Sequence, residues 1–242
     1  MSRSLSGAVV AVIGASGGLG APIARRLVDR GARLVLAGPH VERFTALGIE
    51  DAVAVEFDVR DPRGGDALAA AATERYGRLD GLVNAAGVVA FGPLVETDDT
   101  VIEELFLTNV IGPLWLIKRV VPLLAESRGF VVNLSAVVAE QPMANMAAYS
   151  ATKAALTAAD RALTRELRRV GIQVCDVRPP HTETGLAQRP LAGTAPVLPA
   201  GLSPEHVAAR VIDAIVAGST ELRSEAFSLD ATSSGPEGTA LS

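Results

Sequence analysis

Gly-Ala-Ser-Gly-Gly-Leu-Gly, at residues 14–20, says more about the fold of this chain than any other segment. It follows directly on an apolar run at residues 8–13 and leads into a helical pattern. Glycines let a backbone turn sharply and approach a pyrophosphate closely, and the start of a helix offers N–H donors and a partial positive charge. The spacing G-x-x-x-G-x-G is one residue longer than the usual dinucleotide fingerprint. It favours a dinucleotide loop, and a strand-to-helix turn that binds nothing is the alternative.

Short apolar runs alternate with longer helical patterns on the far side of this loop. The runs do not alternate in polarity, which is typical of parallel strands covered on both faces; they lie at residues 8–13, 33–37, 53–57, 81–83, 130–134 and 173–177. Asp61-Pro62 and Ser203-Pro204 are signatures of a helix start. The alternation predicts an α/β protein: a single-domain, doubly wound parallel sheet over residues 1–222, with helices on both faces.

Length, charge and cysteine count exclude several other classes. A chain of 242 residues suits one α/β domain. A formal net charge of −5 disfavours nucleic acid as a partner, since nucleic acid binds basic surfaces. The single Cys175 and three scattered histidines give neither a disulfide framework nor a metal-ligand spacing. Because no uninterrupted apolar run reaches ~18 residues, we expect no membrane partner and a cytoplasmic protein.

Two segments lack the alternating pattern. Residues 186–202 contain Pro190, Pro196 and Pro199, so they predict a long irregular loop, which we interpret as a lid over a substrate. Its apolar side chains hint at a hydrophobic substrate. Residues 223–242 end in Ser, Gly and Thr and predict a loosely ordered C-terminal tail.

The segment after the second predicted strand bears on which dinucleotide is bound. A carboxylate there would bind the adenosine ribose of NAD, but the sequence reads Ala37-Gly38-Pro39-His40. The missing carboxylate leaves room for a 2′-phosphate, with His40 and Arg43 as candidate partners. This favours NADP over NAD, although Arg43 also fits a solvated helix charge.

Tyr149 and Lys153 are one helical turn apart and so share one face of an alanine-rich helix. An ammonium near a phenol favours the phenolate and lowers the pKa of the phenol towards the working range of a general acid/base. Only two of the 22 basic residues are lysines, Lys118 and Lys153, which suggests a specific need for this one. Surface packing is the alternative reading of the pair.

Taken with the glycine loop, these residues make the chain resemble the short-chain dehydrogenase/reductase family over residues 5–220. The family's markers occur in order; they are Gly14, Gly18, Gly20, Asp58, Asn84, Ala85, Ala86, Gly87, Asn109, Tyr149, Lys153, Arg178, Pro179 and Thr184. The resemblance implies a Rossmann fold and transfer of a hydride between a nicotinamide cofactor and a carbonyl or alcohol. It makes Tyr149 the proton donor or acceptor and lets Lys153 bind the ribose.

The resemblance also implies the cofactor contacts. Asp58 would meet the adenine and Thr184 the nicotinamide or pyrophosphate end. The full expected set is Gly14, Ser16, Gly17, Gly18, Leu19, Gly20, Gly38, His40, Arg43, Asp58, Val59, Asn84, Ala85, Ala86, Gly87, Tyr149, Lys153, Pro179, Thr182 and Thr184.

Asn109 lies in a predicted helix from about residue 98 to 125, four residues before Pro113. Proline cannot donate to the carbonyl of residue i−4, so we expect a kink that frees the Asn109 carbonyl to hold a water. In the family, the equivalent asparagine anchors a water in a proton relay. An asparagine that caps a broken helix is the alternative.

The chain departs from the family pattern at several places. Ala136 stands where the family has its catalytic serine, so either the neighbouring Ser135 supplies the hydroxyl or that hydrogen bond is absent. Losing one donor to a developing oxyanion can cost ~10²–10³ in rate. Pro180 replaces the glycine of the family's Pro-Gly turn. A catalytically inactive nucleotide-binding protein, acting as a sensor or assembly partner, therefore remains an alternative, as does redox-assisted epimerisation or dehydration.

The helix that begins at Tyr149 bears on assembly. Its small residues would permit the close helix packing of the family's common dimer, or would simply be buried within the monomer; they are Ala154, Ala155, Ala158 and Ala159. We expect a homodimer.

Overall fold

The computed structural model describes residues 2–228 and contains one seven-stranded sheet in which every neighbouring pair is parallel. The strand order is β3-β2-β1-β4-β5-β6-β7. The strands are β1 (Val9–Ile13), β2 (Arg33–Gly38), β3 (Val53–Glu56), β4 (Gly81–Asn84), β5 (Phe130–Leu134), β6 (Gln173–Val177) and β7 (Glu221–Leu222). The strand order reverses between β1 and β4, where α/β sheets form their ligand crevice. The predicted doubly wound sheet is confirmed.

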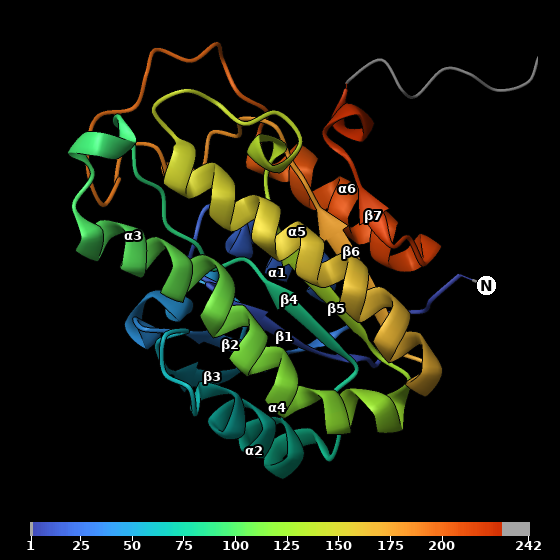
Figure 1. Cartoon of the computed structure of the whole chain (residues 1–242). Helices are drawn as coiled ribbons and strands as arrows, with labels where there is room; N and C mark the ends of the chain where they lie inside the picture. The colour runs from blue at the N-terminus through green and yellow to red at the C-terminus, as the bar shows by residue number, and fades with distance from the viewer. Residues whose placement is uncertain (1, 229–242) are drawn as a thin grey trace, which may run out of the picture.

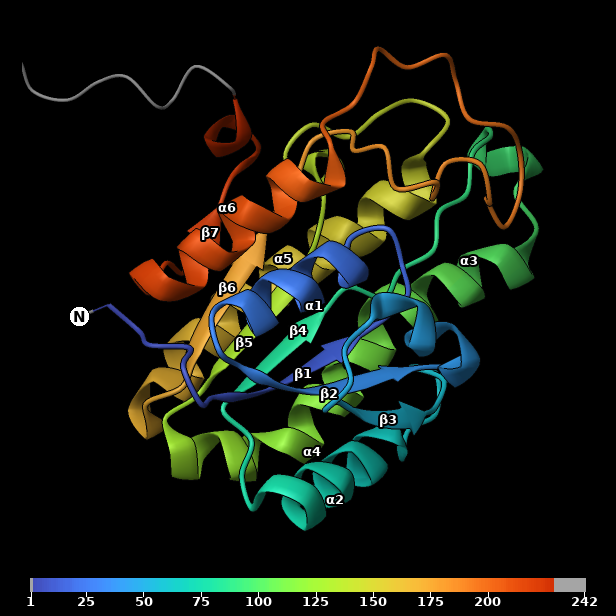
Figure 2. The ribbon, with the colours of Figure 1, turned by 180° about the vertical axis from the view of Figure 1, so that it is seen from behind.

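Helices cover both faces of the sheet. Figure 1 shows α2 (Gly64–Tyr76), α4 (Gly112–Ser127) and α5 (Ala147–Leu167) on one face. Figure 2 shows α1 (Gly20–Asp29) and α6 (Pro204–Ala217) on the other. The strand side chains divide accordingly: Val10 and Val12 pack towards α1 and α6, while Val9 and Ala11 pack towards α2 and α4. This double cover explains why apolar residues point to both faces of the sheet instead of alternating with polar ones.

The predicted helix near residues 98–125 is one continuous helical stretch, Asp99–Ser127, with a wider turn in its middle. It consists of α3 (Asp99–Phe106), a π-helical turn (Leu107–Ile111) and α4, in whose first turn Pro113 lies. The stretch is long and apolar enough by composition to cross a membrane. Its apolar side chains nevertheless pack against the sheet. Leu116, Ile117, Val120 and Leu124 are buried in the core there.

The two predicted helix starts have different outcomes. Ser203 caps α6, because its hydroxyl accepts the N–H of His206 at 3.2 Å. The prediction at Asp61 is wrong: α2 begins at Gly64, and the Asp61 carboxylate accepts the N–H of Arg63 in the preceding turn. A Cβ on Gly64 would overlap the ring of Phe57, so the close packing of this glycine sets where the helix begins.

The ordered domain continues beyond the predicted boundary at residue 222. Ser224–Phe227 form a short helical turn in which Phe227 is fully buried, and the Phe227 carbonyl lies 2.9 Å from Nε2 of His206. This turn belongs to the core because it supplies a phenylalanine to the face under α6. Residues 229–242 of the predicted tail lie outside the described residues.

Candidate active site

A cavity of about 500 Å³ lies at the carboxyl ends of the central strands. One end is formed by the glycine loop and the end of β2, and the other by α5, the turn after β6 and residues 186–198. This volume is typical of a site for a small molecule or cofactor.

The glycine loop folds tightly between β1 and α1. Gly14 adopts φ +70°, a conformation that L-residues rarely adopt, and the N–H of Gly17 donates to its carbonyl at 2.9 Å. A Cβ on Gly18 would overlap Thr184 of the loop after β6. The glycines thus bring three segments of backbone together at the start of α1.

The first turn of α1 leaves room for an anion. Leu19 precedes the helix and offers no side-chain cap, and the turn contains no acidic residue. Unpaired N–H groups and the positive end of the helix dipole bind phosphate groups. The uncapped start of α1, which has no acidic residue, therefore fits the pyrophosphate of a dinucleotide, and this observation does not depend on the glycine motif.

The end of the cavity beside β2 combines bare backbone with charged side chains. Gly38, His40 and Arg43 line it, as the sequence predicts, and His40 lies 3.5 Å from the carboxylate of Glu42. The guanidinium of Arg60 bridges Asp58 and Glu104, and its hydrogen bonds to Asp58 lower the pKa of that carboxyl. Both carboxylates line the cavity, so Arg60 offsets negative charge where the adenine half of a dinucleotide would lie.

Tyr149 and Lys153 lie together at the opposite end of the cavity. Both side chains are buried, and the Lys153 ammonium lies 5.9 Å from the centroid of the Tyr149 ring. Nζ of Lys153 donates to the carbonyl of Leu134 at 2.9 Å. A Cβ on Gly87 would come within 3.5 Å of that nitrogen, so the absence of a side chain there leaves the ammonium accessible from the cavity.

Burial changes the pKa of both groups, in opposite directions. It lowers the pKa of Lys153 to about 8 and raises the pKa of Tyr149, because each loses the hydration of its charged form. The phenol therefore does not show the lowered pKa that its neighbouring ammonium predicts from sequence: desolvation dominates, and the phenol keeps its proton at neutral pH.

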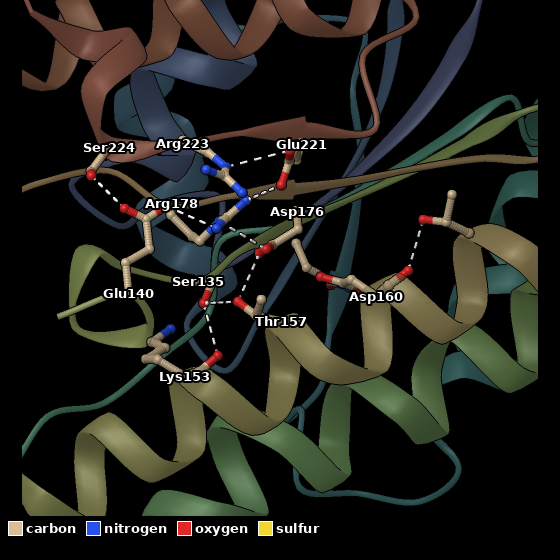
Figure 3. Close-up of polar contacts among 12 residues, drawn as sticks. Ser135, Glu140, Lys153, Thr157, Asp160, Asp176, Arg178, Glu221, Arg223 and Ser224 are labelled. Carbon is tan, nitrogen blue, oxygen red and sulfur yellow. Dashed lines mark hydrogen bonds and ion pairs between the residues drawn. The ribbon is translucent and has the colours of Figure 1, made fainter. Parts of the chain in front are cut away.

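Ser135 and Ala136 differ in what they face. The hydroxyl of Ser135 lies 2.9 Å from the carbonyl of Lys153 and 3.0 Å from Oγ1 of Thr157, inside a buried polar network (Figure 3). Ala136 lines the cavity with a methyl group.

Asn109 lies directly behind the cavity wall, in the π-helical turn. Its side-chain amide exchanges two hydrogen bonds with the backbone of Val88, each 2.9 Å long, and also donates to Thr152 at 3.1 Å. The side chain therefore fixes the segment after β4 against α5, and its carbonyl belongs to the turn that Pro113 interrupts.

Most predicted site residues line the cavity, and three do not. Gly20 packs against the carbonyl of Gly14, and Asn84 donates to Asn133 across the sheet at 3.3 Å. Asn109 is the third. Gly20 and Asn109 contact the wall residues Gly14 and Val88, and Asn84 contacts the neighbouring strand. Sequence reasoning missed other wall residues because no local motif marks them; they are Arg60, Val89, Phe91, Glu104, Thr108, Val137, Val138, Met143, Met146 and Arg189.

Residues 186–202 contain no helix or strand, and four of them line the cavity: Leu186, Ala187, Arg189 and Leu198. The neck of this loop is closed by a bridge between Thr182 and Leu202. The loop is also held by backbone hydrogen bonds from Leu191 to Val89 and from Phe91 to Ala192. Figures 1 and 2 show it in orange at the top of the molecule. Its role as a lid stays a prediction.

Comparison with known proteins places this geometry in a family. A family model for short chain dehydrogenases matches residues 8–193. The chain is 37% identical over 194 residues to L-fucose dehydrogenase of Oryctolagus cuniculus, covering 79% of this chain and 68% of that protein. It is 35% identical over 190 residues to a protein of Streptomyces violaceoruber named as a ketoacyl reductase of granaticin polyketide synthase, covering 75% and 70%.

Solved structures agree. A short-chain dehydrogenase from Streptomyces avermitilis matches with a TM-score of 0.80 and 32% identity, over 90% of this chain and 88% of that one. A short chain dehydrogenase from Burkholderia cenocepacia in complex with NADP matches with a TM-score of 0.80 and 25% identity, over 92% and 90%. The chain therefore belongs to the short chain dehydrogenase family and is an NAD(P)-dependent oxidoreductase.

Proposed function

We propose that the protein interconverts an apolar carbonyl compound and its alcohol with NADP(H), using Tyr149 as the general acid/base. The observation that carries the proposal is the position of Tyr149 and Lys153 on one face of α5, in the wall of a cavity that begins at the glycine loop. The nicotinamide supplies or accepts the hydride when it is bound.

The protein's part in the reaction is to bind, orient and manage one proton. The raised pKa of Tyr149 keeps the phenol protonated, which suits it to donate to a carbonyl oxygen during reduction. The Lys153 ammonium, reachable past Gly87, would hold a ribose hydroxyl and stabilise the phenolate left after transfer. The Asn109 carbonyl, in the π-helical turn, would hold the water that returns a proton to Lys153.

Ser135 enters this mechanism as a positioning residue. Ser135 lines the cavity, but its hydroxyl is engaged by the carbonyl of Lys153 and Oγ1 of Thr157, and Ala136 offers no side-chain donor. The proposed oxygen site therefore has the Tyr149 hydroxyl as its donor, without the second hydroxyl found in the family.

The cofactor preference rests on the end of β2. Glu42 is the one carboxylate in the segment 38–43, and it lies 3.5 Å from His40. Arg43 lines the cavity. We therefore expect NADPH to quench protein fluorescence at lower concentration than NADH, and Arg43→Ala to remove the difference. Equal or tighter binding of NADH in the wild-type protein would contradict the preference.

The substrate side of the cavity is apolar, being lined by side chains such as Val89, Phe91, Val138, Met146 and Leu186. A sugar such as the substrate in the name of L-fucose dehydrogenase would need hydrogen-bond partners for several hydroxyls, which these residues lack. An acyl chain of the kind implied by the name ketoacyl reductase fits such a wall better.

The deciding experiment follows NADPH oxidation by the wild-type protein and by Tyr149→Phe with a panel of hydrophobic aldehydes, ketones and quinones. We expect activity that the substitution reduces by at least ~10². If the wild-type protein binds NADPH but turns over none of the panel above the variant, the nucleotide sensor suggested by Ala136 is the better reading. Product formed without net NADPH consumption would indicate epimerisation or dehydration.

We also propose a homodimer. On α5, Ala154 and Ala158 are exposed and Ala155 and Ala159 are half-buried, so the core of the monomer does not account for these small residues.

A cytoplasmic location stays a prediction, which cell fractionation would test.

A further inference from the structure

A buried polar chain lies directly behind the proposed catalytic lysine. From the carbonyl of Lys153 it passes to Oγ of Ser135 at 2.9 Å, to Oγ1 of Thr157 at 3.0 Å and to Oδ1 of Asp176 on β6 at 3.3 Å (Figure 3). All these side chains are at most 6% exposed. The chain therefore links the turn of α5 that carries Lys153 to one carboxylate in the sheet.

The far end of the chain is a second buried cluster, centred on Arg178. The guanidinium lies 3.0 Å from Asp176, 2.8 Å from Glu140 and 2.5 Å from Glu221. Its Nε and Oδ2 of Asp176 are within ion-pair distance but are not aligned for a hydrogen bond. Three carboxylates thus surround one guanidinium that is 2% exposed, and one of them, Glu221, also lies 3.4 Å from Arg223.

Proton counting bears on the charge of Asp176, because a protonated carboxyl would supply a third proton for the three contacts and an ionised one does not. Three contacts are served by only two hydroxyl protons, those of Ser135 and Thr157. Burial raises the pKa of Asp176, and the Arg178 guanidinium and the hydrogen bond from Thr157 oppose that rise. In the ionised form, Thr157 donates to Asp176 and Ser135 donates to the Lys153 carbonyl, so the contact between the two hydroxyl oxygens has no proton of its own.

We propose that Asp176 is a positioning residue for the reaction, fixing the Lys153 turn through Thr157 and Ser135 and placing its negative charge behind the buried ammonium. The proposal rests on the proposed function, in which Lys153 must be charged to hold the ribose and stabilise the phenolate. The side chains of Ser135, Thr157 and Asp176 do not need to touch substrate or cofactor for this role.

The electrostatic part of the proposal has a definite direction. Burial lowers the pKa of Lys153 to about 8, and the charge of Asp176 opposes that fall. Tyr149 is the other titratable group at the ammonium. Asp176 itself faces charged or titratable groups from several elements, namely Cys175 on β6, Arg178 directly after β6, Asp160 and Arg161 on α5, and Glu221 on β7.

Asp160, on the same helix as Lys153, provides a matched control for Asp176. It is as buried as Asp176, and Nδ2 of Asn133 donates to it at 2.6 Å. Burial raises the pKa of Asp160 well above the usual range. Asp160→Asn replaces a buried carboxyl that lies outside the Ser135–Thr157–Asp176 contacts, and Asp176→Asn replaces the carboxyl at their end, each at nearly constant shape.

The lysine content of the protein allows the charge of Lys153 to be measured directly. Its only lysines are Lys118 and Lys153, so protein labelled with ¹³C at the lysine Cε has two signals, and exposed Lys118 serves as an internal reference. We expect Asp176→Asn to lower the Lys153 midpoint by about one pH unit, with Lys118 and the Asp160→Asn variant unchanged. A Lys153 midpoint that stays within error in folded Asp176→Asn would overturn the proposal.

Activity gives a second readout. With a midpoint lowered from about 8 by about one unit, the fraction of charged Lys153 falls about fivefold at pH 8 and about twofold at pH 7. The alkaline limb of kcat should therefore move to lower pH in Asp176→Asn while KM changes little. A uniform loss at every pH, without movement of the limb, would show a merely structural role and count against the proposal.

Thr157→Val tests the positioning part and serves if Asp176→Asn does not fold. It keeps the carboxylate and removes its hydroxyl donor, so we expect kcat to fall several-fold at unchanged KM. Wild-type kcat together with an unshifted Lys153 signal would overturn the proposal. Failure of the proposed function is distinguishable, since it would appear as a wild-type protein without Tyr149-dependent turnover, whatever the lysine signals show.

Discussion

At the scale of single residues, the adjacent positions 135 and 136 decide how many donors face the reacting oxygen. The hydroxyl at Ser135 is turned into the protein, and the methyl group of Ala136 lines the cavity from an extended backbone position. Serine adopts that backbone conformation without strain. A single substitution can therefore add the donor that the family has and this chain lacks.

We predict that Ala136→Ser raises kcat/KM for the reduction of a reactive ketone by at least tenfold, because one donor to a developing oxyanion is worth ~10²–10³ in rate. Steady-state assays with NADPH check this. The control is Ser135→Ala, which should lower stability by about 1–2 kcal/mol by leaving buried partners unpaired. Unchanged kcat/KM in Ala136→Ser would mean that another group already stabilises the oxygen.

The buried charge of Lys153 predicts a conflict between activity and stability. Burial lowers its folded pKa from 10.5 to about 8, and one pKa unit is 1.36 kcal/mol, so the ammonium costs about 3 kcal/mol at neutral pH. Lys153→Met removes this cost but also the hydrogen bond to Leu134, worth about 1 kcal/mol. We expect an inactive variant that is more stable than wild type by about 2 kcal/mol at pH 7.

The pH dependence of that difference gives its sign. Below pH 8 the lysine is charged in both the folded and the unfolded protein, and the cost is full; from pH 8 to about 10.5 only the unfolded chain keeps the proton, and the cost fades. Urea unfolding of both proteins at pH 7 and pH 10 measures the difference. A variant less stable than wild type at pH 7, or a gap that widens with pH, would contradict the charge cost.

At the scale of elements, the lid is held at its tip by a glycine that no side chain can replace. Gly193 adopts φ +73°, and a Cβ there would overlap the carbonyl of Phe91, beside the two backbone hydrogen bonds that join these segments. We predict that Gly193→Ala raises KM for substrate several-fold and leaves NADPH binding unchanged, because the cofactor loop lies elsewhere in the cavity.

Gly48 offers the matched control for this loop. It also has a positive φ, of +67°, but a Cβ there would meet open space. Gly48→Ala therefore carries a similar backbone strain of about 1–2 kcal/mol without touching the lid. If both variants change KM equally, the effect belongs to general destabilisation and the lid does not shape the site.

The same scale shows what local sequence could predict. The glycine loop, the apolar runs and the Tyr149–Lys153 spacing are local patterns, so they located the strands, the tight turn before α1 and the face of α5 that lines the cavity. The pairing of Arg60 with Glu104 and the burial of Phe227 join residues far apart in sequence. The raised pKa of Tyr149 depends on burial, which its neighbour four residues away does not indicate. Such features follow only from the assembled structure.

At the scale of the whole molecule, the parallel sheet brings the carboxyl ends of its strands to one edge, and helices cover both of its faces (Figures 1 and 2). The face of α5 that bears Tyr149, Lys153 and Asp160 packs inwards, which leaves Ala154 and Ala158 on the outer face. A surface of small side chains permits a second helix to approach closely without cost to the site behind it.

We therefore predict that the wild-type protein sediments as a dimer and that Ala158→Glu shifts it to a monomer, because paired carboxylates would be buried at the contact without partners. Ala70→Glu, on the exposed side of α2, is the control and should leave the dimer intact. Sedimentation velocity over a range of protein concentrations measures this. A monomeric wild type, or a dimer that tolerates the charge on α5, would show that these alanines face solvent only, and that the active site is complete in one chain.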